Sequence, residues 1–158
     1  MRSSPSRRYR APHLLTFVLE PHEGVEPVCL RMGASEVRAA MQDIGCSHDE
    51  HPRERRDLFL DNAFQVFYDS GGRVEYIELS YSDTFIAEFD GVAVLQVAAE
   101  DAVEAVATRA PLDQGDPELG WSFVFPELDL ALWRPTREDE SFSTVGVGVE
   151  GYFSRSGA

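Results

Sequence analysis

The chain has 158 residues, of which 28 are acidic, 14 are basic and 43% are hydrophobic. This length suits one domain. A net charge of −14 at pH 7 argues against nucleic acid and anionic membranes as partners, because phosphate groups repel such a surface. No apolar run approaches the ~20 residues that a bilayer span needs, and the first residues lack the apolar stretch of a secretory signal. We therefore expect a cytoplasmic protein.

The charge is distributed unevenly along the chain. Residues 1–10 contain four arginines and no acid, so residues 11–158 have 10 arginines against 28 acidic residues, a net charge of −18. The opening segment is rich in Ser, Arg and Pro and has no periodicity, which predicts a disordered basic tail over residues 1–12. One domain is then expected over residues 13–158. The two cysteines, Cys29 and Cys46, are expected to be free thiols, with a single bridge as the alternative.

Hydrophobic periodicity predicts a first strand over residues 14–19 and a Pro- and Gly-containing loop after it. Residues 33–45 form the clearest helix, because apolar residues recur at helical spacing and a glycine ends the pattern. Residues 46–57 are polar and predict a connection between elements. A second helix is expected over residues 98–109, ended by Pro111.

Between and after the helices the period changes to two, which predicts strands. Residues 64–68 and 73–81 flank the turn sequence Asp69–Gly72 and form the most secure hairpin of the chain. Further strands are expected in four segments: residues 85–97 with a turn at Asp90 and Gly91, and residues 121–125, 128–133 and 142–149.

The order helix, polar loop, strand, turn, strand occurs twice, at offsets of 65 to 68 residues. This pattern predicts an α+β fold: an antiparallel sheet with two helices on one face, built as a tandem repeat of a helix–strand–strand unit with halves at residues 30–85 and 90–150. Chance alternation is the alternative explanation, because residue identity between the halves is low.

Two resemblances follow from these patterns. The layout over residues ~30–150 resembles the β-lactamase inhibitory protein family, which repeats a helix-plus-sheet unit and holds its target with the uncovered concave face of the sheet. The segments Val74–Ser80, Phe123–Pro135 and Phe142–Gly148 look like small acidic bacterial proteins of unassigned function, several families of which accompany polymorphic toxins as immunity proteins. The resemblances imply a protein-binding inhibitor and transfer no individual residue's role.

Candidate chemistry in the sequence is sparse. Cys46, His48 and His51, with Cys29 upstream, offer thiolate and imidazole ligands for zinc, but their spacing matches no common zinc module. No Gly-x-Ser-x-Gly sequence is present, and the glycine pairs lack the following helix that a phosphate-binding loop requires. We therefore expect no catalytic residue, no metal and no cofactor.

The second face of the predicted sheet is the more informative feature. Alternation places large aromatic residues among acids and small residues there, a mixture typical of protein-binding surfaces. Further chain covering that face is the simpler structural alternative for any single residue. The residues assigned to this face are Gln65, Phe67, Tyr76, Glu78, Asp129, Trp133, Thr144, Gly146 and Gly148.

The sequence therefore predicts an immunity protein that neutralises a basic toxin, such as a nuclease, by occluding its active site. Trp133 and Tyr76 are expected to anchor the partner, with Phe67 beside them. The acids expected to pair with its basic residues are Glu78, Asp129, Glu138, Asp139 and Glu140. A monomer or a small homo-oligomer is expected.

Three alternatives stay open. A small-molecule-binding or regulatory module should show a closed apolar pocket. A metal-dependent enzyme should use the loop from Cys46 to His51. Finally, the acidity can be generic solubility charge that implies no partner.

Overall fold

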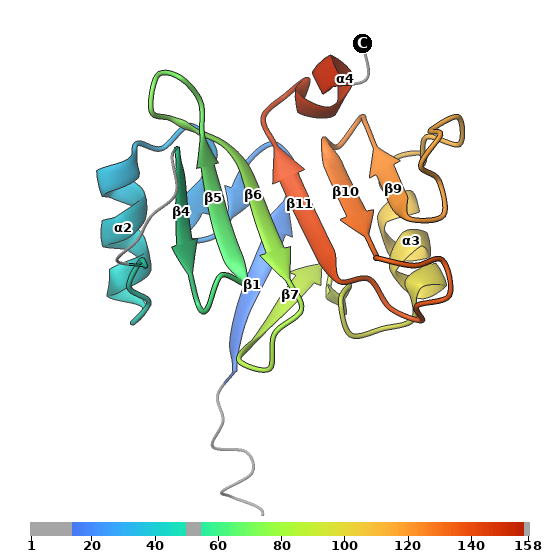
Figure 1. The fold of residues 1–158 in the computed structure, drawn as a ribbon, viewed down its shortest axis with the longest axis horizontal. Coiled ribbons are helices and arrows are strands. Elements are labelled where there is room, and N and C mark those ends of the chain that lie inside the picture. Colours follow the sequence, from blue (N-terminus) through green and yellow to red (C-terminus); the bar gives the residue numbers. More distant parts are fainter. Residues whose placement is uncertain (1–13, 50–54, 157–158) are drawn as a thin grey trace, which may run out of the picture.

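A computed structural model describes residues 14–49 and 55–156. The predicted tail over residues 1–12 and the candidate metal ligand His51 lie outside the described residues. Six strands form one antiparallel sheet in the spatial order β4-β5-β6-β11-β10-β9 (Figure 1). These strands are β4 (Arg56–Phe59), β5 (Phe64–Tyr68), β6 (Val74–Ser80), β9 (Ser122–Phe125), β10 (Leu130–Trp133) and β11 (Thr144–Gly148).

A smaller sheet of five strands lies behind the first one in the order β3-β2-β1-β7-β8. Its two longest strands, β1 and β7, run parallel to each other, with Leu15 opposite Phe85. The strands of this sheet are β1 (Leu15–Glu20), β2 (Gly24–Val25), β3 (Val28–Cys29), β7 (Phe85–Phe89) and β8 (Val92–Ala93). The sequence did not predict this second sheet, because three of its strands have only two residues and its central pairing joins distant segments.

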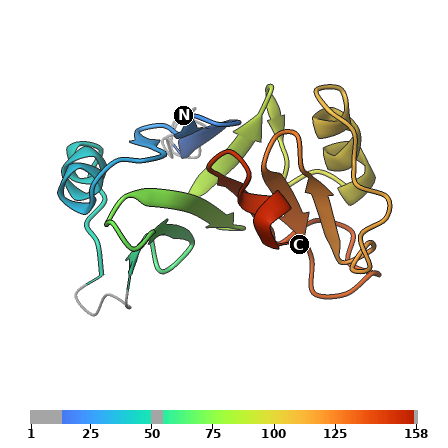
Figure 2. The same ribbon diagram turned by 90° about the horizontal axis from the view of Figure 1, so that it is seen from above.

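The helices α2 (Ala34–Asp43) and α3 (Ala99–Ala107) lie at the two ends of the small sheet, on the same side of the six-stranded sheet (Figure 2). The core lies between the two layers. There the ring of Phe17 on β1 meets Phe64 of the large sheet at 4.8 Å and Phe85 of the small sheet at 5.2 Å, both edge to face. The predicted α+β fold, with an antiparallel sheet and two helices on one face, is confirmed.

The order of elements in the first half, β1-β2-β3-α2-β4-β5-β6, is followed by β7-β8-α3-β9-β10-β11 in the second half. The strands that end the halves, β6 and β11, pair with each other in the middle of the large sheet. A tandem repeat in the sequence itself stays a prediction.

Both predicted helices are present, and each is three residues shorter than expected. The hairpin β5–β6 forms around Asp69, whose side chain accepts hydrogen bonds from the backbone N–H groups of Gly71 and Arg73. Asp90 and Gly91 have positive φ in the turn between β7 and β8, as a two-residue hairpin requires. No helix in the described part of the chain is long and apolar enough to span a membrane.

Two further elements were missed. Strand β4 lies partly in the segment expected to be a polar connection, and a short helix, α4 (Tyr152–Ser156), follows β11. In β4 the charged residue Asp57 occupies a core-facing position, which breaks the alternation that would have marked a strand.

Asp57 is buried because three hydrogen bonds replace its hydration. Arg38 of α2 contacts both carboxylate oxygens, with Nε 3.0 Å from Oδ2 and Nη2 2.9 Å from Oδ1. The hydroxyl of Tyr68 donates to Oδ2 at 2.7 Å. Burial and this hydrogen bond raise the pKa of Tyr68, so the phenol stays protonated and remains a donor. The bidentate pair fixes α2 to the end of the large sheet.

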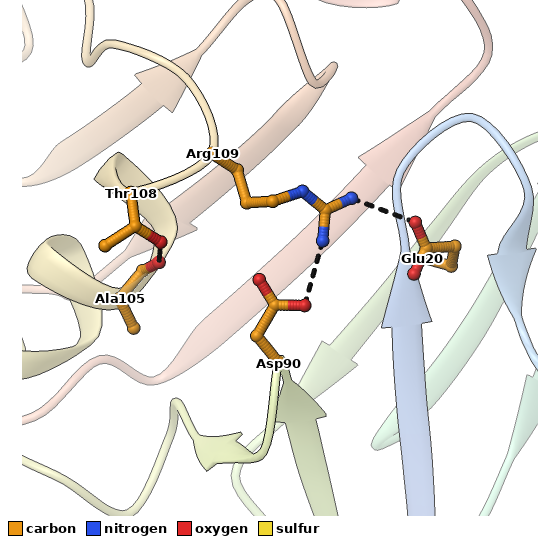
Figure 3. A network of polar contacts seen from close by, with 5 residues as sticks. All are labelled: Glu20, Asp90, Ala105, Thr108 and Arg109. Carbon is orange, nitrogen blue, oxygen red and sulfur yellow. Dashed lines mark hydrogen bonds and ion pairs between the residues drawn. The ribbon is translucent and has the colours of Figure 1, made fainter.

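A second arginine joins α3 to the small sheet on the surface. Figure 3 shows Arg109, two residues beyond α3, between two carboxylates: Nη2 is 2.9 Å from Glu20 Oε2 and Nη1 is 2.8 Å from Asp90 Oδ1. The side chains of Glu20 and Asp90 are 45% and 41% exposed, against 1% for Asp57. Solvent therefore screens the Arg109 contacts much more strongly than the Arg38 contact.

This contrast predicts unequal effects of removing the two arginines. Arg38→Ala should lower the free energy of unfolding by about 3 kcal/mol, because it leaves the buried carboxylate of Asp57 without its cation. Arg109→Ala should lower it by about 1 kcal/mol or less. Urea unfolding at pH 7 measures both values, and equal losses would contradict the assignment of Arg38 as the stabilising contact.

Candidate partner-binding surface

One face of the six-stranded sheet points away from the small sheet and both helices, and we call it the open face (Figure 2). Alternation along the strands, together with the burial of the opposite residues, assigns its members. Eight of the nine residues predicted for this face lie there: Gln65, Phe67, Tyr76, Glu78, Trp133, Thr144, Gly146 and Gly148.

One end of the open face, at the top in Figure 1, is covered by the chain itself. The ring of Tyr152 on α4 stacks on Tyr76, with the ring centroids 4.7 Å apart and the planes 4° apart. Phe153 meets the same ring edge to face, and Phe67 contacts it from the other side at 5.5 Å. Tyr76 is therefore half-buried beneath rings of this chain, and its role as an anchor stays a prediction.

The two glycines of β11 make room for these tyrosines. A Cβ at Gly146 would collide with the hydroxyl and ring of Tyr76, and a Cβ at Gly148 would collide with Tyr152. The small residues do leave space on the face, as the sequence indicated, but side chains of this chain fill part of that space.

Glu78 lies at the centre of the open face, between Gln65 on β5 and Gly146 on β11. It is half-buried, and burial raises the pKa of its carboxyl group above the ordinary value, although the charge of Arg56 acts in the opposite direction. The guanidinium of Arg56 lies over the ring of Phe67, 5.2 Å from its centroid, and donates to Gln65 Oε1 at 3.2 Å.

Asp129 does not lie on the open face, so its predicted position is wrong. It is 2% exposed, at a positive φ in the turn before β10. Its carboxylate accepts hydrogen bonds from the backbone N–H groups of Gly151 and Phe153 and contacts His22 Nε2 at 3.0 Å. Asp129 therefore holds α4 against the sheet and is a structural residue.

At the other end of the sheet, at the bottom in Figure 1, lie the end of β6, the start of β9 and the end of β10. Three exposed aromatic residues at these strand ends form what we call the aromatic rim: Tyr81, Trp121 and Trp133. They are 52%, 38% and 42% exposed and are the exposed large aromatic residues of the described chain. Backbone hydrogen bonds connect their strand ends: Tyr81 N to Ser143 O, Ser143 N to Trp133 O, and Arg134 N to Trp121 O. The rim thus follows four neighbouring strands.

The sequence predicted Trp133 and missed the other two. Tyr81 follows the last residue of β6 and reaches solvent. Trp121 directly precedes β9 and carries the guanidinium of Arg137 over its ring, 5.1 Å from the centroid. Their positions just beyond strand ends, where neighbouring elements no longer cover a side chain, are the only signal that could have found them.

An acidic loop adjoins the rim between β10 and β11. The backbone carbonyls of Asp139 and Glu140 accept hydrogen bonds from Arg134 Nη1 and Ala99 N, and the Asp139 side chain accepts one from Thr136 N. These contacts fix the loop. The carboxylates of Glu138 and Glu140 form no ion pair with any described residue and are exposed.

The other candidate sites are the cysteines, the predicted metal ligands and the hollows in the surface. Cys29 and Cys46 are free thiols, and no group of three or more His, Cys, Asp or Glu within the described ranges could hold a metal ion. Hollows in the surface have charged linings: one of about 470 Å³ includes Glu20, Glu23 and Glu26, and one of about 360 Å³ includes Arg38 and Arg55. They are unlike the closed apolar pocket expected of a small-molecule-binding module.

Comparison of the chain with protein-family models, curated proteins and solved structures finds no significant match. The resemblances to immunity proteins and to the β-lactamase inhibitory protein family therefore stay predictions.

The position of Glu78 predicts a pH-dependent effect on stability. Because its pKa is raised in the folded state, its contribution is fully present below the ordinary pKa of glutamate and is lost as the pH rises through the raised value. Glu78→Gln should therefore increase the free energy of unfolding at pH 7. At pH 4 the same substitution should increase it less. Urea unfolding at both pH values checks this, with Glu88→Gln on the small sheet as the matched control. A loss of stability at pH 7 would contradict it.

The packing of Tyr76 over Gly146 predicts a second effect. Gly146→Ala should lower the free energy of unfolding by about 2 kcal/mol, because the new methyl group must displace the tyrosine ring. The same substitution in a Tyr76→Ala background should have a much smaller effect. A double-mutant cycle by thermal unfolding measures the coupling, and additive effects would show that the two residues are not in contact.

Proposed function

We propose that this chain is a protein-binding inhibitor, an immunity protein that neutralises a basic toxin by occluding the toxin's active site. The aromatic rim carries the proposal, because three exposed aromatic residues lie on neighbouring strand ends at one end of the sheet and an acidic loop adjoins them.

Exposed tryptophan and tyrosine side chains are typical anchors of protein interfaces. They bury a large area with few rotatable bonds, and they dominate binding energy when a partner removes them from water. Neighbouring strands are ~4.8 Å apart, so the four strand ends of the rim span ~14 Å. This is the scale of a central cluster of anchors within a standard interface.

The charges indicate the kind of partner. The exposed carboxylates of Glu138 and Glu140 lie in the loop that begins directly after Trp133 and Arg134, in a chain with a net charge of −14. Acidic groups beside apolar anchors accelerate association with a basic surface and disfavour acidic partners. A nuclease has such a surface where it binds phosphate groups, and a toxin of that class is the partner we propose.

The test uses the toxin-like reading frame that this function requires beside the gene of this chain. Expression of that frame should stop bacterial growth, and co-expression of this chain should restore it. Trp133→Ala and Trp121→Ala should each weaken binding of the purified toxin at least about tenfold, and the double variant should lose protection.

Ile44→Ala is the matched control, because Ile44 is 37% exposed but lies beyond α2, away from the rim. It should protect as well as the unmodified chain. A neighbouring gene without toxicity, or rim variants that bind the toxin as tightly as the control, would overturn the proposal.

A further inference from the structure

The open face has two polar groups for which the described residues provide no partner. The carboxylate of Glu78 makes no hydrogen bond and no ion pair there. The hydroxyl of Tyr76 likewise makes no hydrogen bond with any residue that the structure describes. Buried or half-buried polar groups without partners are uncommon in folded proteins, and each one requires a physical explanation.

The two groups are neighbours. Glu78 is directly opposite Gly146 in the β6–β11 pair, and the hydroxyl of Tyr76 lies over the same glycine. Since opposite residues in an antiparallel pair have Cα atoms about 5 Å apart, the Tyr76 hydroxyl over Gly146 lies beside the Glu78 side chain. The rings of Tyr76 and Tyr152 stack on the side of α4.

The cation nearest to this position is already engaged elsewhere. Arg56 lies over the ring of Phe67 and donates to Gln65, so its guanidinium attracts Glu78 through space without bonding to it. Within the described part of the chain, the half-buried carboxylate of Glu78 therefore has acceptor sites that no donor occupies.

We propose that Glu78 and the Tyr76 hydroxyl form a receptor for one guanidinium group, an arginine side chain of the partner protein. The inference rests on the proposed function and adds a second contact point to it, at the centre of the open face. A planar guanidinium can donate two parallel hydrogen bonds to a carboxylate and a further one to a hydroxyl oxygen. Gly146 has no side chain, so the Tyr76 ring lies against the sheet there and its hydroxyl is held on the strand beside Glu78.

The test uses methylguanidinium as the probe, with the full chain labelled with ¹⁵N and the ionic strength held constant. The NMR chemical shifts of the backbone amides of Gln65, Glu78 and Gly146 should change together as the probe concentration rises. The three changes should follow one saturation curve. Glu78→Gln should weaken this binding at least about tenfold, and Tyr76→Phe, which keeps the ring stack, should weaken it several-fold. Methylammonium should bind more weakly, and uncharged N-methylurea should give no saturable shifts at these amides.

Glu88→Gln is the matched control, because Glu88 is also half-buried in mid-strand but belongs to the small sheet. It should leave the probe's affinity unchanged. Shifts spread over many acidic residues, or equal binding to the Glu78 and Glu88 variants, would overturn the inference. Either result would leave the proposed toxin binding untouched, because the rim variants Trp133→Ala and Trp121→Ala test it. The two proposals can therefore fail separately.

Discussion

The pairing of β6 with β11 is the constraint on which the open face depends. It joins the two halves of the chain in one sheet and aligns Ile77 with Val147 on the core side. On the other side the same register sets Glu78 opposite Gly146 and Tyr76 opposite Gly148. A shift by one residue would exchange the faces, bury the polar residues and remove the glycines from beneath the tyrosines.

The sequence predicted the elements whose amphipathic pattern is local. The hairpin β5–β6 and the helices α2 and α3 each bury one face and have turn or stop residues nearby, so periodicity sufficed. It failed where a charged residue is buried. Asp57 and Asp129 occupy interior positions because distant residues, Arg38 and His22, satisfy them, and no local pattern reports such a partner. The parallel β1–β7 pairing joins segments about 70 residues apart and left no local signal either.

The candidate surface was predicted only in part, because alternation reports on residues within regular strands and not on those outside them. Alternation placed Trp133 and Glu78 correctly, since both lie within regular strands. It could not place Trp121 and Tyr81, which lie just outside strands, where the period of two no longer applies. Nor could it show that Tyr76 is covered, because the five-residue helix that covers it is too short to have a recognisable pattern.

The acids of this chain therefore have different physical roles, and net charge alone does not distinguish them. Asp57 and Asp129 are buried with several donors each and stabilise the fold. Glu78 has a raised pKa and no donor within the described residues, so its ionised form reduces the stability of the isolated chain. Exposed aromatic side chains at the rim are likewise unfavourable in water. A partner of the proposed kind would pair the Glu78 carboxylate and remove the rim side chains from water, so the open face and its rim support the proposed function more than the overall acidity does.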